Sequence, residues 1–290
     1  MIDMLYTVPV ICSDGTISYL PATRLWLIAV VDIASRTILG YTLSCERKYN
    51  QTDVLTALRD SIMPRVKIDF SIPGFKYPEN GGFPCFCVEK TNWAIFDAVM
   101  LDNEKSHLSH DVVTKITQKL KSSVNFGPVE SPEVRAIIER LFQTLEKLGY
   151  HRTPSTTGSN INDSRSENAV SDAIKYRVDY NDIVEITEYL ITVYNNKSHS
   201  SLDGRTPLQV ISERINIAGM TPSIANEQMR KVVKGLTNIV IERTVRGGYK
   251  RGKRPYISYE GVEYRNEAIS ISNNLVGSKI FLEVNPEDIS

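Results

Sequence analysis

The sequence predicts an α/β protein in which helices pack on a mixed sheet, followed by a small β-rich module. Three observations support this fold class. β-rich runs occupy the start of the chain, strands then alternate with amphipathic helices, and short β-rich pieces separated by Gly turns follow residue 238. With 290 residues, 41% of them apolar and 23% charged, the chain can fill one core and a smaller module.

The first strands are predicted from apolar runs that lack helical periodicity. Residues 2–11 are β-rich, residues 25–33 form a nearly continuous apolar run, and residues 36–44 continue after a polar turn. A turn is expected at 14–18, between the first two runs. Three adjacent strands are therefore expected.

A helix is predicted to begin at a cap formed by Thr52 and Asp53 and to end before Pro64, because apolar residues recur between them at helical spacing. The segment 67–92 is rich in Gly and Pro and shows no periodicity. It is expected to be a surface insertion.

Strands and helices alternate in the next part of the chain. The expected elements are a strand ending at Asp102, a helix after Ser109, a short strand at 122–127, a helix after Pro132, a mobile loop at 151–172, and helices at 181–196, 206–215 and 225–235. This order predicts three parts: a catalytic-type domain at 1–215, a helical linker at 216–237, and a small all-β barrel at 238–290 that stops early.

Several classes of protein are excluded. The longest apolar run, 25–31, is far shorter than the roughly 20 residues that a membrane span needs, and no signal peptide opens the sequence, so a cytoplasmic protein without a membrane partner is expected. Four cysteines give no disulfide framework, and Cys85 and Cys87 lack a second pair of zinc ligands at a suitable distance.

One segment is strongly basic although the formal net charge is zero. Residues 243–254 contain six basic residues and no acidic ones, and Tyr249 and Tyr256 are interleaved with these charges. The basic residues are Arg243, Arg246, Lys250, Arg251, Lys253 and Arg254. Such a segment is predicted to contact the DNA backbone without sequence preference, although a flexible linker is the plainer interpretation.

Three carboxylates are candidates for a metal site. Glu139 interrupts the apolar pattern of its helix, Asp102 ends a predicted strand beside Asn103, and Asp3 lies in the first strand. Carboxylate oxygens are ligands that Mg²⁺ prefers, and two such ions can drive phosphoryl transfer. Spacing alone is weak support, because 34 acidic residues offer many triples.

Four sequence blocks carry a family resemblance. "VVDIASRTILGYTLS", "FDAVMLDN", "SPEVRAIIERLFQTL" and "YNNKSHSSLDGRTPLQV" together resemble DDE transposases of the Mu and Tns B-subunit type, in the retroviral-integrase superfamily. The resemblance covers roughly residues 1–215, and the tail is similar to the small β-barrel that follows the core in that group.

The resemblance implies a ribonuclease-H-like mixed sheet with flanking helices, and two Mg²⁺ or Mn²⁺ ions held by Asp3, Asp102 and Glu139. Asp3 would bridge both ions, while Asp102 and Glu139 would each hold one. Water activated between the ions would cleave the transposon end, and the freed 3′-hydroxyl would attack target DNA.

The resemblance also implies binding partners and a cellular location. Transposon-end and target DNA are the expected substrates, with self-assembly into a synaptic oligomer, and an ATPase for target selection is compatible with it. The expected setting is the bacterial cytoplasm, at the nucleoid. Because the chain starts two residues before Asp3, without the helical end-recognition domains usual in the family, a fragment is expected.

Plainer interpretations remain for several residues. Asp32 competes with Asp3 for the first metal position, but it is favoured as a turn residue that accepts hydrogen bonds from the segment of Ser35. Asn103 orients Asp102 or caps a turn. His107 and His110 are expected to be capping or surface residues. His199, Arg205 and Pro207 are expected to pack a loop. Arg140 and Lys147 are expected to be solvated, with a phosphate contact as the alternative for Arg140.

Two other functions stay open at this point. One is a domesticated, catalytically inactive transposase that acts in DNA binding or assembly. The other is a ribonuclease-H-type nuclease that cuts without joining.

Overall fold

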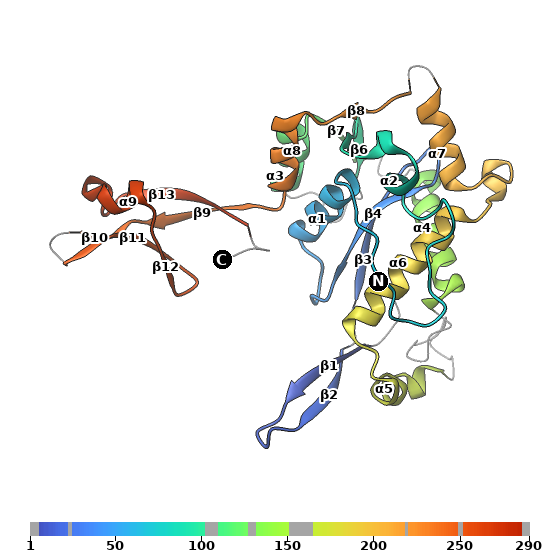
Figure 1. Cartoon of the computed structure of the whole chain (residues 1–290), viewed down its shortest axis with the longest axis horizontal. Helices are drawn as coiled ribbons and strands as arrows, with labels where there is room; N and C mark the ends of the chain where they lie inside the picture. The colour runs from blue at the N-terminus through green and yellow to red at the C-terminus, as the bar shows by residue number, and fades with distance from the viewer. Residues whose placement is uncertain are drawn as a thin grey trace. The chain divides into compact units, whose positions relative to one another are not determined.

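A computed structural model gives the fold of the chain (Figure 1). It describes residues 6–22, 25–101, 110–126, 132–150, 165–217, 220–248 and 252–285, with the backbone alone at 132–135 and 165–170. The chain divides into two compact units, Met1–Leu236 and Thr237–Ser290.

The first unit mixes short strands with longer helices. Its strands are β1 (Tyr6–Ile11), β2 (Ile17–Ala22), β3 (Trp26–Val31), β4 (Ile38–Ser44), β5 (Ala94–Ile95), β6 (Ala98–Met100), β7 (Ser123–Asn125) and β8 (Ser223–Ile224). Its helices are α1 (Gln51–Ile62), α2 (Pro84–Cys87), α3 (His110–Thr114), α4 (Pro132–Leu148), α5 (Arg165–Tyr176), α6 (Tyr180–Asn196), α7 (Pro207–Asn216) and α8 (Glu227–Lys234). The predicted strands at the start of the chain and the later alternation of strands and helices are confirmed.

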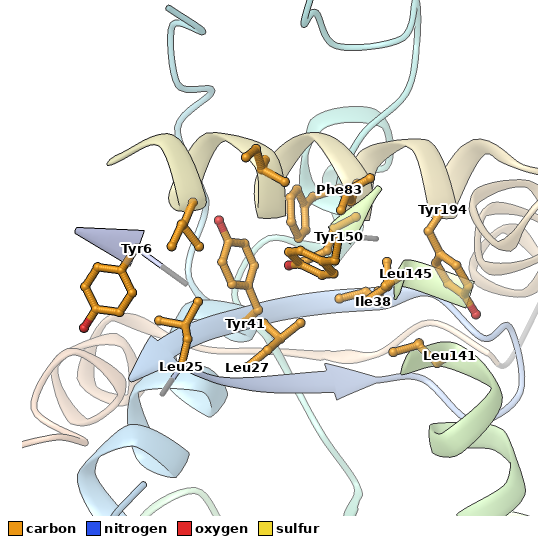
Figure 2. Close-up of a cluster of buried hydrophobic side chains, with 14 of the residues drawn as sticks. Tyr6, Leu25, Leu27, Ile38, Tyr41, Phe83, Leu141, Leu145, Tyr150 and Tyr194 are labelled. Carbon is orange, nitrogen blue, oxygen red and sulfur yellow. The ribbon is translucent and has the colours of Figure 1, made fainter. Parts of the chain in front are cut away.

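The β3–β4 hairpin lies between two helices. Leu27 and Tyr41 enter a hydrophobic cluster with residues of α6, and Figure 2 shows them below this helix. Val30 belongs to a second cluster built around α1 and α3. Gly40 faces α1, where a Cβ atom would lie 2.6 Å from the Cα atom of Ser61. The alternation of strand side chains therefore gives each face of the hairpin its own helix.

The N-cap of α1 lies two residues earlier than predicted. Asn50, rather than Thr52, is the N-cap, and it forms a capping box with Asp53. The predicted end before Pro64 is confirmed, because the helix ends at Ile62.

β2 was not predicted. It pairs antiparallel with β1 from the Tyr6–Ala22 pair to the Ile11–Ile17 pair, where only a turn was expected at 14–18. Ile17 and Leu20 are exposed, and Pro21 interrupts the run, so the usual signal of a half-buried strand is absent.

The expected loop at 151–172 is partly wrong. Residues 165–172 form the start of α5, while 151–164 lie outside the described residues. Ala173 is fully buried on this helix. The polar, Ser- and Asn-rich start of α5 concealed its short apolar face.

The insertion at 67–92 is attached to the core more firmly than a surface loop. Phe83 is fully buried, and Figure 2 shows it in the cluster between α6 and the sheet. Phe75 stacks on Tyr189 of α6 with ring centroids 4.1 Å apart. Glu185 of α6 accepts hydrogen bonds from both the amide and the hydroxyl of Ser71. The prediction missed this because these contacts join residues far apart in sequence.

The second unit contains two small sheets. Its elements are β9 (Ile239–Thr244), β10 (Arg246–Gly248), β11 (Lys253–Tyr259), β12 (Val262–Tyr264), α9 (Glu267–Ile271) and β13 (Lys279–Val284). β9 pairs with β13, and β10, β11 and β12 form a three-stranded antiparallel sheet. The expected small all-β barrel is corrected in two respects: the described strands close no barrel, and a helix lies among them.

The fold class is mixed α/β, as predicted. The described strands form separate sheets of two or three strands, and β6 and β7 are the parallel pair among them. A continuous ribonuclease-H-like sheet therefore stays a proposal. α8, within the predicted linker at 216–237, contributes the buried Val233 to the second cluster of the first unit. Within the described segments, no helix is long and apolar enough to cross a membrane.

Candidate functional site

Glu139 lies on the outer side of α4. Leu141 and Leu145 of the same helix are buried in the first hydrophobic cluster, and the helix packs against α6. Glu139 is exposed, which follows from its rotation of about 200° from Leu141 on a 3.6-residue helix. Its carboxylate is therefore available to solvent or to a ligand, while the helix that carries it is held rigidly by packing.

The other two predicted metal ligands, Asp3 and Asp102, lie outside the described residues, as do Asn103 and His107. The structure describes the strand before Asp102 up to Leu101, whose amide donates to the carbonyl oxygen of Asn125 at 2.9 Å. Within the described ranges, no group of three or more His, Cys, Asp or Glu side chains could hold a metal. The predicted triad thus remains a prediction.

Asp32 has the turn role that was favoured for it. Its Oδ2 atom accepts hydrogen bonds from the amide and the hydroxyl of Ser35, at 2.7 and 2.6 Å. The Thr37 hydroxyl contacts that of Ser35 at 2.8 Å and donates to the carbonyl of Pro207 at 2.9 Å. The turn between β3 and β4 is therefore fixed against the start of α7.

The predicted loop-packing residues hold the connection between α6 and α7. The guanidinium of Arg205 donates to the carbonyl of Leu202 and to the carboxylate of Glu213, and Pro207 is the first residue of α7. The His199 amide donates to the Arg205 carbonyl at 3.0 Å. These contacts confirm packing roles for Arg205 and Pro207.

His110 and Lys147 are surface residues, as expected. His110 is the exposed first residue of α3, and its Nδ1 atom lies 3.1 Å from the Thr114 hydroxyl. Lys147 is exposed in the last turn of α4.

The basic segment is partly neutralised by its neighbour strand. Lys253 of β11 and Arg265 both form ion pairs with Glu263 of β12. The sequence interpretation missed Glu263, because it lies outside the 243–254 run and approaches only through strand pairing. Lys250, Arg251 and Tyr249 lie outside the described residues.

Two cations of this segment lie over tyrosine rings. Arg243 lies over the ring of Tyr259 at 5.4 Å, and Lys253 lies over Tyr256 at 4.6 Å. Arg246 and Arg254 are exposed, and no ion pair involves them among the described residues. The arrangement of cations and aromatic rings suits contact with a nucleic-acid backbone.

Comparison with known proteins identifies the family of the chain. The model of the family described as the TnsB C-terminal domain matches residues 6–155, just over half of the chain. The chain belongs to the TnsB C-terminal domain family. The matched region of this family contains Glu139 and Arg140 and begins after Asp3.

The chain is also similar to the transposase for transposon Tn552 of Staphylococcus aureus. It is 25% identical over 271 residues, which cover 92% of this chain and 46% of that protein. The chain thus spans about half the length of this relative.

Proposed function

We propose that this chain carries the catalytic part of a DNA transposase that cleaves transposon ends and joins the 3′-hydroxyl to target DNA. The observation that carries the proposal is membership of the TnsB C-terminal domain family, together with the similarity to a transposase along 92% of the chain. The exposed Glu139 on a helix otherwise used for packing supports the same assignment.

The donor set proposed for the metal fits a hard divalent cation. Asp3, Asp102 and Glu139 offer carboxylate oxygens, which Mg²⁺ and Mn²⁺ favour, and the exposed position of Glu139 leaves its oxygens accessible. When bound, two such ions supply Lewis-acid activation of the attacking oxygen and stabilisation of the leaving oxygen. We propose that the three carboxylates hold these ions within a ribonuclease-H-like core.

The chain itself contributes binding and positioning. α4 holds Glu139 in a fixed position, because Leu141 and Leu145 anchor the helix in the core. Arg140, on the same exposed turn, contacts a DNA phosphate in this proposal. Arg243, Arg246 and Arg254, with Lys250, Arg251 and Lys253, add backbone contacts that raise affinity without reading sequence.

Assembly belongs to the same proposal. The expected partners are transposon-end DNA, target DNA and further copies of the protein in a synaptic complex. Partnership with an ATPase that selects the target is part of the proposal, as is a bacterial cytoplasmic, nucleoid-associated setting.

A strand-transfer assay on the full-length protein tests the function. The substrates are DNA carrying the ends of the element that encodes the protein, in intact and pre-cleaved forms, with plasmid target DNA and Mg²⁺ or Mn²⁺. Cleavage of the intact ends and joining of the pre-cleaved ends are expected. Cleavage without joining would indicate a nuclease, and DNA binding without either reaction would indicate an inactive assembly protein.

A further inference from the structure

A small pocket in the first unit is not used by the metal site proposed above. Its volume is about 80 Å³, and it lies among the turn after β3, the middle of α4 and the segment after α6. Its lining includes Arg36, Arg140, Thr144, Tyr194, His199 and Ser201. On a comparable measure one water needs roughly 10 to 15 Å³, so the pocket has room for a group of a few heavy atoms.

Two of the residues that line this pocket have a buried nitrogen atom without a partner. Nη1 of Arg36 and Nε2 of His199 make no hydrogen bond within the described part of the chain. Buried polar groups in native proteins are nearly always paired, so each unpaired one calls for an explanation. Two such atoms on residues that line one pocket suggest that these side chains turn toward a ligand that occupies it.

The charge of the pocket indicates what kind of ligand would fit. Arg36 and Arg140 carry permanent positive charges, and no carboxylate is among the described residues that line the pocket. Tyr194, Thr144 and Ser201 add hydroxyl groups. A guanidinium matches the oxygens of a phosphate group particularly well, because its N–H donors form a planar fork.

The backbone of Arg36 and the ring of His199 are held by local contacts. Arg36 has a left-handed backbone with φ of 64°, and its amide donates to the Asp32 carbonyl at 2.8 Å. The His199 ring meets the Tyr194 ring edge-on, with centroids 4.8 Å apart. Holding these two parts of the pocket before binding reduces the entropy that is lost when a ligand enters.

We propose that this pocket is a phosphate-binding site in which Arg36 and Arg140 hold the oxygens of one phosphate group, and His199 donates to it in its protonated form. The ligand is a backbone phosphate of bound DNA, and this identification rests on the proposed function, whereas phosphate binding itself does not. Arg140 follows Glu139 directly on α4, so a phosphate held here would belong to a strand that passes beside the proposed metal site.

The test measures binding in EDTA, so that neither metal nor catalysis enters it. Inorganic phosphate is titrated into the full-length protein while the His199 ring resonances are followed by NMR. Binding of a random-sequence DNA duplex is measured separately over a series of salt concentrations. The variants are Arg36→Gln, Arg36→Lys and the control Arg214→Gln, which changes an exposed arginine of α7.

The wild-type His199 resonances should shift with phosphate, and Arg36→Gln should abolish most of that shift. In the DNA measurement, Arg36→Gln should weaken binding by roughly tenfold at low salt. The number of phosphate contacts calculated from the salt dependence of the affinity should decrease by about one. Arg36→Lys should retain most of that salt dependence, and Arg214→Gln should behave as wild type.

Wild-type phosphate and DNA binding in Arg36→Gln would overturn the proposal. Loss of phosphate binding with unchanged DNA binding would support the pocket but assign it to free phosphate, overturning the DNA identification. If the wild-type protein bound phosphate and no DNA, the proposed function would fail while the phosphate site stood.

Discussion

Arg65 donates a hydrogen bond of 3.0 Å to Glu188, whose side chain is 1% exposed. The same carboxylate accepts from the hydroxyls of Tyr41 and Tyr77, at 2.9 and 2.8 Å. Glu188 lies on α6, whereas Arg65 and Tyr77 lie in the segment that follows α1. This buried network therefore attaches that segment to the core.

Breaking this ion pair from one side should destabilise the first unit strongly. Arg65→Met leaves the Glu188 carboxylate buried without its cation, which costs about 3 to 5 kcal/mol in comparable cases. Urea denaturation monitored by tryptophan fluorescence gives the free energy of unfolding. The control is Glu213→Ala, which breaks an exposed pair with Arg205 and should cost less than about 1 kcal/mol. Equal losses in the two variants would show that the network contributes no more than a surface pair.

The double variant Arg65→Met, Glu188→Leu separates charge burial from packing. Once neither charge remains, much of the loss seen in Arg65→Met should be recovered, because no unpaired carboxylate is left in the core. Tyr41 and Tyr77 lose their acceptor, so recovery should be incomplete. A double variant less stable than Arg65→Met would contradict this account.

Gly40→Ala should destabilise the packing of α1 on the sheet. The added Cβ would lie 2.6 Å from the Cα and 2.7 Å from the backbone nitrogen of Ser61, so the helix must move. Overpacking of this kind typically costs about 1 to 3 kcal/mol. Gly204→Ala is a comparison without such a contact, although its positive φ adds strain. If Gly40→Ala lost less stability than Gly204→Ala, the close packing of Gly40 against α1 would be contradicted.

The local parts of this fold were predictable from the sequence. The apolar spacing of Val54, Leu55, Leu58 and Ile62 predicted α1, and these residues are buried in the second cluster. The long apolar run likewise predicted β3. In such segments the local pattern and the tertiary contacts favour the same structure.

Long-range side-chain contacts were not predictable in this way. Asn195 of α6 accepts from the amide of Ile38 and donates to the carbonyls of Ile38 and Gly82. No periodicity marks such a residue, since its partners are far away in sequence. The phosphate pocket was not predictable for the same reason, because Arg36, Arg140 and His199 come from three segments that are far apart in sequence. Of the proposed metal ligands, Glu139 alone is among the described residues.

Acid should destabilise the fold through His199. Burial lowers the pKa of His199, and the positive charges of Lys197 and Arg36 act in the same direction. Arg140 lines the same pocket, and burial raises the pKa of Tyr194 to about 12, so that phenol stays neutral in this range.

The sign follows from the lowered pKa. As pH falls below about 6.5, the unfolded chain takes up a proton at this histidine before the folded chain does. The stability present above that pH is therefore lost progressively as pH decreases. His199→Gln removes this titration, so its urea midpoint should fall less than that of the wild type between about pH 7.5 and 5.5. An equal fall in both proteins would show that His199 does not contribute.

Divalent metal should stabilise the folded protein if the three carboxylates form a site. Mg²⁺ or Mn²⁺ binds the folded state selectively, so the melting temperature should rise with metal concentration. Glu139→Gln should reduce this rise. The melting temperature in metal-free buffer with EDTA is the reference value for both proteins. The same rise in wild type and Glu139→Gln would place the bound metal elsewhere.

The last prediction tests the catalytic role of Glu139. Gln preserves the size and helix propensity of the side chain but removes the charge that would hold the metal. Because Glu139 is exposed, the fold should survive, and the circular dichroism spectrum should match that of the wild type. Loss of one charged ligand should cost about 4 kcal/mol of transition-state stabilisation, roughly a thousandfold in rate.

End cleavage and strand joining should decrease together in Glu139→Gln, since one metal site is proposed for both steps. Glu146→Gln is the matched control, because Glu146 lies two turns further along α4. It should leave both rates within a fewfold of wild type. If Glu139→Gln retained such rates in Mg²⁺, Glu139 would be a surface residue of a packing helix. If it lost joining alone, the two steps would not share this carboxylate, because a common ligand must affect both.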